Sequence, residues 1–278
     1  MLPAAPTSPY KEKMWRHLAN HKQDVLRVPC NGIWKGNKKE YSHILPYGYQ
    51  HLNILEPYRE EFWKFFRSTD INLHSDFHHL SSSQAMCFNL FFPFIAEKKK
   101  HVQILREIFS TDGAVEDARF EVVLVPNEGT NFDFYLQTEK SRKLFEIKLT
   151  ERDFGKAKSD AAHFAKFKTV YLPALNGKFD PSCCSCDVFL KHYQIMRNVW
   201  NLDVGTGDTL VCIVPKANTS LTEEIGFLKN CLSEKYHNRV TVFYLEDLAA
   251  SLEKAIPHDA IRVREHFRLF GKKYFPLD

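Results

Sequence analysis

The apolar residues of the chain change their spacing several times, and each change predicts a different kind of element. Residues 1–60 show no regular period and contain several prolines, which favours an irregular arm over a domain. The stretch 60–67 (EEFWKFFR) predicts a short helix. A serine cap at Ser81–Ser83 before AMCFNLFFPFI predicts a largely buried helix that Pro93 bends or ends. Helical spacing in residues 97–109 predicts an amphipathic helix.

Three strands follow with short connections between them. Residues 120–125 (FEVVLV) predict the first strand, and clean alternation in residues 131–136 (NFDFYL) and 144–149 (LFEIKL) predicts the next two. The polar connection between the last two is short enough for a hairpin. The middle of the chain is therefore expected to form an antiparallel meander.

Strands and helices alternate in the last third of the chain. Helices are predicted at 187–200, 221–236, 246–254 and 260–270, and strands at 209–214 and 240–245. Such alternation predicts parallel pairing, with helices covering the sheet. We therefore expect an α/β fold whose mixed central sheet, a three-stranded antiparallel meander extended by the later strands, is flanked by helices. We expect residues 1–70 to be an N-terminal extension or arm and residues 71–278 to form one domain.

Composition narrows the class of protein only slightly. The chain has 278 residues, of which 44% are hydrophobic and 23 are Phe, as expected for a folded protein with a large core. Its net charge of +4 permits a nucleic-acid partner without demonstrating one. The most apolar run, residues 85–96, is too short to cross a bilayer. Seven scattered cysteines predict reduced thiols and a cytoplasmic protein.

The two hairpin strands carry charged residues on the face opposite their apolar side chains. Glu146 and Lys148 lie two apart and share a face, and antiparallel pairing brings Asp133 opposite one of them. Two carboxylates on rigid strands suit Mg²⁺ or Mn²⁺. A lysine beside them can hold a phosphate oxygen, orient water or offset developing charge, as metal-assisted phosphodiester hydrolysis requires. The alternative is a solvent-exposed face with a weak cross-strand salt bridge.

This pattern resembles the signature of the PD-(D/E)XK nuclease superfamily. Asp133 is followed by Glu146-Ile147-Lys148 between apolar strands, although Phe132 stands where that signature has proline. The order helix, three-stranded meander, helix and strand over about residues 97–215 is similar to the superfamily's core. Segments between roughly residues 75 and 250 also resemble a little-characterised bacterial PD-(D/E)XK-like family.

The resemblance implies a restriction-endonuclease-like fold and Mg²⁺- or Mn²⁺-dependent cleavage of DNA. It implies that Asp133 and Glu146 bind the metal and that Lys148 assists the nucleophile. The helix after the meander often adds a polar residue in this superfamily, a role that Gln194 or Tyr193 can fill.

The superfamily often takes a further acidic ligand from its first helix or first strand. Glu121 is the nearest candidate for this role and Glu107 the second, while an outward-facing position remains an equal alternative for Glu121. The fold also hosts inactive relatives, so a catalytically inactive nucleic-acid- or partner-binding protein is the alternative function. Cutting both strands of DNA would favour a homodimer with two active sites.

Several other groups of residues suggest contacts or metals. We interpret two groups of lysines as contacts to a DNA backbone: Lys98–Lys100, and Lys156, Lys158, Lys166 and Lys168. Some nucleases of this fold hold an iron–sulfur cluster, but Cys30 with Cys183, Cys184 and Cys186 lacks suitable spacing, so we expect ordinary thiols. For His74, His78 and His79 we expect a capping or surface role, with a DNA-backbone contact as the alternative.

Overall fold

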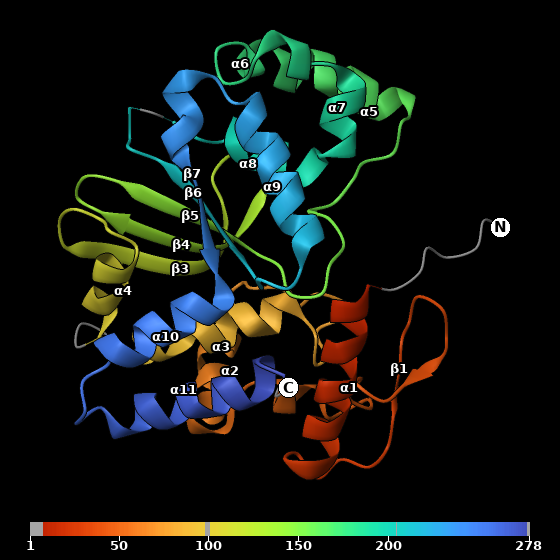
Figure 1. Ribbon diagram of the computed structural model, residues 1–278, viewed down its shortest axis with the longest axis vertical. Coiled ribbons are helices and arrows are strands. Elements are labelled where there is room, and N and C mark those ends of the chain that lie inside the picture. The colour runs from red at the N-terminus through yellow and green to blue at the C-terminus, as the bar shows by residue number, and fades with distance from the viewer. Residues whose placement is uncertain (1–7, 98–100, 204, 277–278) are drawn as a thin grey trace. The chain divides into compact units, whose positions relative to one another are not determined.

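The chain forms two compact units. The computed structural model describes residues 8–97, 101–203 and 205–276 (Figure 1). The first unit contains residues 1–109 and 246–278, and the second contains residues 110–245. The boundary expected between residues 70 and 71 falls inside the first unit. Lys98–Lys100 lie outside the described residues.

The second unit is built on a five-stranded mixed sheet. Its strands are β3 (Val115–Val123), β4 (Asn131–Thr138), β5 (Arg142–Ile147), β6 (Thr209–Val214) and β7 (Val240–Tyr244). They follow the order β3-β4-β5-β6-β7 across the sheet. β3, β4 and β5 pair antiparallel, whereas β6 and β7 extend the sheet in parallel from β5. The predicted fold class, a meander extended by later strands, is confirmed.

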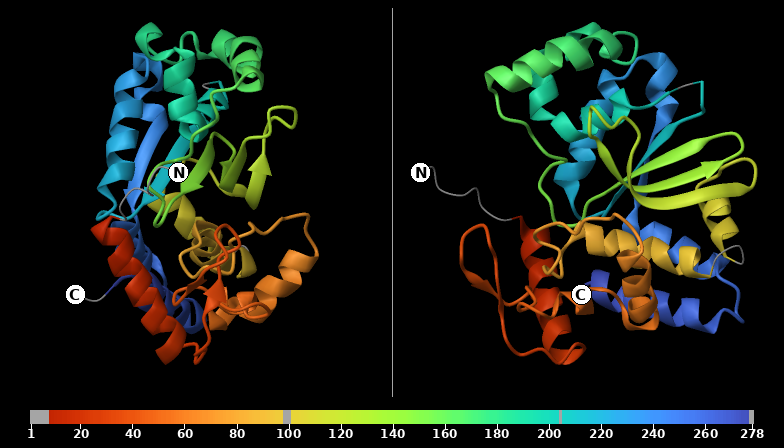
Figure 2. Two further views of the ribbon diagram at one scale, coloured as in Figure 1. Left: turned by 90° about the vertical axis from the view of Figure 1, so that its right-hand side faces the viewer. Right: turned by 180° about the vertical axis from the view of Figure 1, so that it is seen from behind.

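Helices cover one face of this sheet, as Figures 1 and 2 show. The helical segments of the unit are α5 (Ala161–Lys166), the π-helical turn η4 (Phe167–Tyr171), α6 (Leu172–Leu175), η5 (Pro181–Cys183), α7 (Cys186–Lys191), α8 (Tyr193–Trp200), α9 (Thr219–Cys231) and η6 (Glu234–Arg239). Apolar side chains of α8 and α9, among them Ile195 and Ile225, pack with Leu144 and Leu210 of the strands. The single helix predicted at 187–200 is wrong in one respect, because it breaks at His192 into α7 and α8.

The first unit is largely helical. Its elements are α1 (Pro9–Asp24), β1 (Gly32–Ile33), β2 (Glu40–Tyr41), the 3₁₀ turns η1 (Gln50–Asn53) and η2 (Glu56–Tyr58), α2 (Arg59–Arg67), α3 (Ser83–Ala96), α4 (Val102–Ile108), α10 (Leu245–Ala255) and α11 (Ile261–Tyr274). Ser82 caps α3 as predicted, and Pro93 lies inside that helix without ending it.

The expectation that residues 1–60 are irregular is wrong for α1. Ser8 caps this helix by accepting a hydrogen bond from the amide of Lys11, and Pro9 occupies its first turn. Proline at the start of a helix is favourable, since its fixed φ matches and the missing N–H would have no partner. The buried positions of α1 include His21 and Lys22 as well as Met14 and Leu18, which conceals the apolar period in the sequence.

A buried polar network joins distant segments of the first unit. Nζ of Lys273 on α11 donates to the backbone oxygen and to Oδ1 of Asn53, both at 2.6 Å. The Asn53 amide donates in turn to the carbonyls of Phe77 and His79 at 2.6 and 2.8 Å. Asn89 of α3 donates to the Asn53 carbonyl at 2.9 Å. Because Asn53, Asn89 and Lys273 are buried, each of these side chains depends on its partners to replace water.

Two cysteines of the second unit form a disulfide. Cys183 in η5 is bonded to Cys231 at the end of α9, with their Cα atoms 5.7 Å apart. The expectation of reduced thiols is therefore wrong for this pair, which the sequence separates by 48 residues. The other cysteines are free, and they include Cys30, Cys184 and Cys186. Among the described residues, no helix combines the length and apolar character needed to cross a membrane.

The buried network predicts that Asn53→Ala destabilises the first unit. The change removes one acceptor from the buried Lys273 Nζ and the donor for two carbonyls, so we expect a loss of about 2–4 kcal/mol in the free energy of unfolding. Urea denaturation measures this loss. Asn72→Ala is the control, because the exposed Asn72 side chain makes one long hydrogen bond of 3.4 Å and should change stability by less than about 0.5 kcal/mol. Equal effects of the two changes would contradict the proposed importance of the network.

Candidate active site

The strand register sets Asp133 and Glu146 opposite one another. Phe134 pairs with Phe145 and Tyr135 with Leu144, so the next pair in the same ladder is Asp133 with Glu146. This is one of the two registers expected from strand parity. On the other face, the rings of Phe120, Phe134 and Phe145 follow one another across β3, β4 and β5, with centroids 5.2 and 5.4 Å apart. Aromatic packing on that face holds the register that aligns the acids on this one.

Glu146 is fully buried, and three side chains donate to its carboxylate. Lys148 lies 2.9 Å from Oε1, and the Gln194 amide donates to the same oxygen at 2.7 Å. The Asn198 amide donates to Oε2 at 2.9 Å. The ion pair between Glu146 and Lys148 therefore exists, but the alternative of a solvent-exposed salt bridge is wrong, because these side chains are 1% and 12% exposed.

Helix α8 positions two of these donors. Gln194 and Asn198 are four residues apart, so their side chains project from the same face of the helix. Gln194 also accepts a hydrogen bond from Lys148 at 3.0 Å and thereby links the lysine to the carboxylate. Tyr193, the alternative to Gln194, instead places its hydroxyl 3.3 Å from that of Tyr171. Asn198 was missed by sequence reasoning, although its spacing from Gln194 was a usable signal.

A glycine makes room for Gln194. Gly155 has φ of 113°, in the region that favours glycine, and a Cβ at this position would lie 3.1 Å from Gln194 Oε1. The backbone N–H of Gln194 donates to the Gly155 carbonyl at 3.3 Å. The loop after β5 therefore packs directly against the amide that holds Glu146.

The charges of the site act on one another. Burial, followed by the negative charge of Glu146, raises the pKa of Asp133 well above its ordinary value. Asp133 Oδ2 also accepts a hydrogen bond from the backbone N–H of Ile147 at 2.6 Å. Burial alone would lower the pKa of Lys148, but Glu146, together with other nearby carboxylates, raises it overall. Lys148 is therefore a firmly protonated cation, whereas ionisation of Asp133 beside Glu146 is disfavoured.

The two candidates for a further acidic ligand lie in different surroundings. Glu121 on β3 falls between the Phe120–Phe134 and Val122–Phe132 pairs, at the level of Asp133. Its backbone has φ of 54°, and its carboxylate accepts a hydrogen bond from Asn131. Glu107 lies on α4 in the first unit, largely exposed beside Arg106. A ligand role for Glu121 stays a prediction.

Asp133 and Glu146 have the donor chemistry that a hard divalent cation prefers. Their carboxylate oxygens suit Mg²⁺ or Mn²⁺, and such a cation would offset both the burial and the nearby charge of Glu146 that raise the pKa of Asp133. In the part of the chain that the structure describes, no three His, Cys, Asp or Glu side chains are grouped to hold an ion. The residues thus fit a cation bound by two protein carboxylates, with water and phosphate oxygens completing its coordination.

The lysines predicted to contact DNA differ in their surroundings. Lys156 pairs with Asp153 at 2.9 Å, and Lys166 donates to the Glu128 carbonyl at 3.1 Å. Lys158 and Lys168 are exposed. Among the described lysines of this set, Lys158 and Lys168 are thus exposed and form no ion pair.

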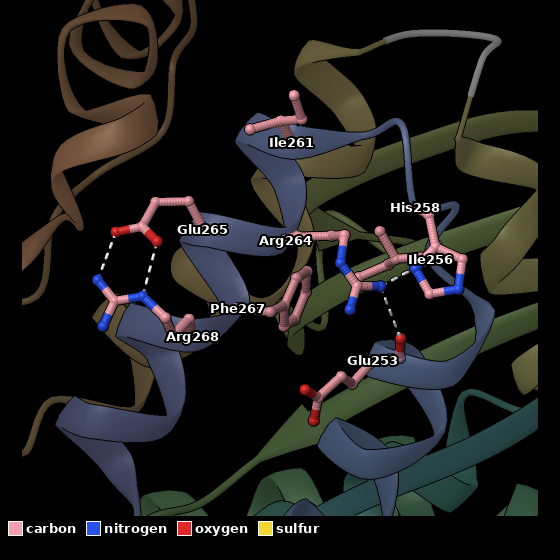
Figure 3. A pocket seen from close by; sticks show the side chains of 8 residues that line it. All are labelled: Glu253, Ile256, His258, Ile261, Arg264, Glu265, Phe267 and Arg268. Atoms are coloured by element: carbon pink, nitrogen blue, oxygen red, sulfur yellow. Dashed lines mark hydrogen bonds and ion pairs between the residues drawn. The ribbon is translucent and has the colours of Figure 1, made fainter.

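A pocket in the first unit contains none of the residues predicted for the active site. It lies between α10 and α11 (Figure 3). Arg268 forms a two-point ion pair with Glu265, and Arg264 donates to the carbonyls of Glu253 and Ile256. Its arginines are thus already engaged with protein acceptors.

The sheet and its flanking helices define an α/β protein of the restriction-endonuclease-like class. The model of the family described as "Restriction Endonuclease associating with ARP" matches residues 15–275. The chain therefore belongs to this family, in agreement with its resemblance to PD-(D/E)XK nucleases, and a nuclease-type function follows. No curated protein and no solved structure matches the chain.

The raised pKa of Asp133 predicts a pH-dependent stability. Folded Asp133 retains a proton that the unfolded chain releases above about pH 3.9, so the free energy of unfolding falls as the pH rises toward the folded pKa. Asp133→Asn removes this charge while keeping an acceptor for Ile147. We expect a higher thermal midpoint than wild type at about pH 8 in EDTA, and a smaller difference near pH 4.

Asp160→Asn provides a control of opposite sign. Hydrogen bonds from His163 lower the pKa of Asp160, so neutralising this aspartate should reduce stability at neutral pH. A destabilised Asp133→Asn protein at about pH 8 would contradict the repulsion described for the site.

Proposed function

We propose that the chain is a divalent-metal-dependent endonuclease that hydrolyses phosphodiester bonds in DNA. The observation that carries the proposal is the placement of Asp133, Glu146 and Lys148 together at the junction of β4 and β5. Membership of a restriction-endonuclease family supports the nuclease class. The family description supports DNA as the substrate, and the mildly basic charge of +4 is compatible with it.

Each charged residue has a role that follows from its surroundings. Lys148 stays protonated, so it can donate to a phosphate oxygen or to an attacking water and offset negative charge that develops on the phosphate. Gln194 and Glu146 restrain the ammonium at 3.0 and 2.9 Å. A restrained cation loses little entropy when the substrate binds, which favours the transition state.

Asp133 and Glu146 are the residues that would hold the cation. Bound Mg²⁺ or Mn²⁺ supplies Lewis acidity, which polarises the phosphate and lowers the pKa of water. Glu146 Oε1 accepts from both Lys148 and Gln194, whereas Oε2 accepts from Asn198. Since a carboxylate oxygen has two lone pairs, Oε2 is the atom of Glu146 that we propose for the cation.

The hydrogen bonds of Glu146 also favour a second candidate function. Three donors already satisfy this carboxylate, so it needs no metal ion to remain buried. A binding protein without catalysis is therefore compatible with the same scaffold. Such a protein would bind DNA or a partner with no requirement for Mg²⁺.

A homodimer with two active sites would allow the active enzyme to cut both strands of a duplex. This oligomeric state stays a prediction.

Cleavage assays on linear, circular and single-stranded DNA test the proposal. With Mg²⁺ or Mn²⁺ the wild-type protein should cut DNA, and EDTA should prevent it. Glu146→Gln and Lys148→Met each keep the side-chain volume while removing one charge, and each should reduce the rate by at least about 100-fold.

Loss of folding must be separated from loss of chemistry, because Glu146 and Lys148 are buried. Arg142→Met is a matched control, since Arg142 makes a two-point ion pair of 2.6 Å with the buried Asp208 at the other end of β5. It should lower the thermal midpoint yet retain cleavage at a temperature where the protein is folded. Cleavage by Lys148→Met at the wild-type rate would contradict the catalytic assignment.

The contact of Asn198 with Glu146 predicts a smaller loss of activity. Asn198→Leu removes one donor from the carboxylate, and changes of residues that orient metal ligands typically cost about 10–100-fold. Asn201→Leu, one turn along, is the control because Asn201 donates to Glu128 and not to Glu146. Equal cleavage rates for the two folded variants would show that Asn198 does not position Glu146.

A further inference from the structure

A compact hairpin in the first unit carries a concentrated positive charge. It consists of β1 and β2, which pair antiparallel, and the loop between them, and it extends from its unit in Figures 1 and 2. The loop contains Lys35, Lys38 and Lys39, and all three side chains are exposed. Among the described residues, none of the three ammonium groups forms an ion pair. Glu40 is the acidic residue of the same hairpin.

Hydrogen bonds within the loop hold the lysines in place. The backbone N–H of Trp34 donates to the Lys39 carbonyl at 2.9 Å, and that of Lys38 donates to the Trp34 carbonyl at 2.8 Å. The Asn37 amide donates to the Tyr41 hydroxyl at 2.7 Å, and its Oδ1 accepts from the Lys39 N–H at 3.1 Å. The loop is therefore ordered by its own contacts before any partner binds.

Trp34 anchors the loop to the rest of the first unit. Its indole N–H donates to Asp76 at 3.2 Å, and its ring meets Tyr41 and His79 edge to face at 6.1 and 6.2 Å. A Cβ on Gly36 would lie 3.0 Å from the indole ring, so the loop backbone folds directly over Trp34. This packing engages Trp34 and leaves the lysines at the surface.

Lys38 occupies a backbone conformation that lysine rarely adopts. Its φ is 62°, in the left-handed region where glycine and asparagine are favoured. Glycine would form the same turn with less strain, so the fold itself does not require lysine at this position. A strained residue with an exposed charge is a reason to seek a role for that charge outside folding.

We propose that the β1–β2 hairpin binds the phosphate backbone of duplex DNA. Three unpaired cations on a preordered loop complement a polyanion, and each lysine that neutralises a phosphate releases a counterion. The assignment rests on the proposed function because DNA is the substrate proposed there. It adds a second contact surface in the first unit, outside the sheet that carries Asp133, Glu146 and Lys148.

The salt dependence of binding tests the hairpin directly. The full chain in EDTA is titrated with a short labelled DNA duplex at several NaCl concentrations, and binding is measured by fluorescence anisotropy. Changing Lys35, Lys38 and Lys39 together to Gln should weaken binding by about 10–100-fold near 0.1 M salt. The slope of log affinity against log salt should become shallower by about 2–3.

A matched triple variant controls for net charge. Lys235, Lys254 and Lys272 are exposed and lie outside the hairpin, so changing all three to Gln removes the same charge. This control should alter the slope by less than about 1. Equal effects of the two triple variants would overturn the proposal, as would a wild-type protein that binds anionic lipid vesicles but no DNA.

Lys38→Gly separates a binding role from a structural one. The change removes strain, so the thermal midpoint should stay the same or rise, while the slope should become shallower by about 1. A lower midpoint with an unchanged slope would show that Lys38 serves the fold and would overturn its assigned contact.

The binding and cleavage experiments can contradict the hairpin proposal and the nuclease proposal separately. If wild type cleaves DNA with Mg²⁺ but the hairpin variants bind normally, the hairpin assignment is wrong and the nuclease proposal stands. If the hairpin variants lose binding and wild type never cleaves, the nuclease proposal is wrong and the hairpin remains a DNA-binding surface.

Discussion

The architecture of the candidate site depends on one constraint, the burial of the Glu146 carboxylate. A carboxyl group with no exposure must have hydrogen-bond partners, since burial without them costs several kcal/mol. Lys148 on the same strand and Gln194 and Asn198 on α8 provide those partners. The site is therefore shared between a strand and a helix, and α8 must be held accurately against the sheet.

Two further contacts restrain α8. Arg197 forms an ion pair with the buried Glu128, whose pKa is about 2 because Arg197 and further hydrogen bonds outweigh the opposing effect of burial. Lys178 donates at 2.5 Å to the carbonyl of Trp200, the last residue of α8, and at 2.6 Å to that of Leu202 just after it, and burial lowers the pKa of this lysine to about 8. These contacts hold the helix near its middle and at its end. They explain how Gln194 and Asn198 can keep hydrogen-bonding geometry toward Glu146.

Sequence patterns predicted the parts that repeat and missed those that depend on single contacts. Strand alternation placed Asp133 and Glu146 on one face, because the side-chain period of a strand is fixed. The helical break at His192 and the disulfide partner of Cys183 follow from three-dimensional packing and have no local period. Helix α1 was not predicted because its buried face includes the polar residues His21 and Lys22, so no regular apolar spacing is visible in the sequence. The alternative of a solvent-exposed salt bridge is wrong, because the Lys148 side chain is 12% exposed and is held by Gln194 of α8 as well as by Glu146 of its own strand.

The central claim is that Asp133 and Glu146 together hold a divalent cation. Titration of the metal-free protein with Mn²⁺, followed by the loss of the free Mn²⁺ electron paramagnetic resonance signal, measures this binding directly. The account predicts that wild type and Arg142→Met bind Mn²⁺, and that Asp133→Asn and Glu146→Gln bind it far more weakly while remaining folded. Undiminished binding by both carboxylate variants, or no binding by wild type, would contradict the account.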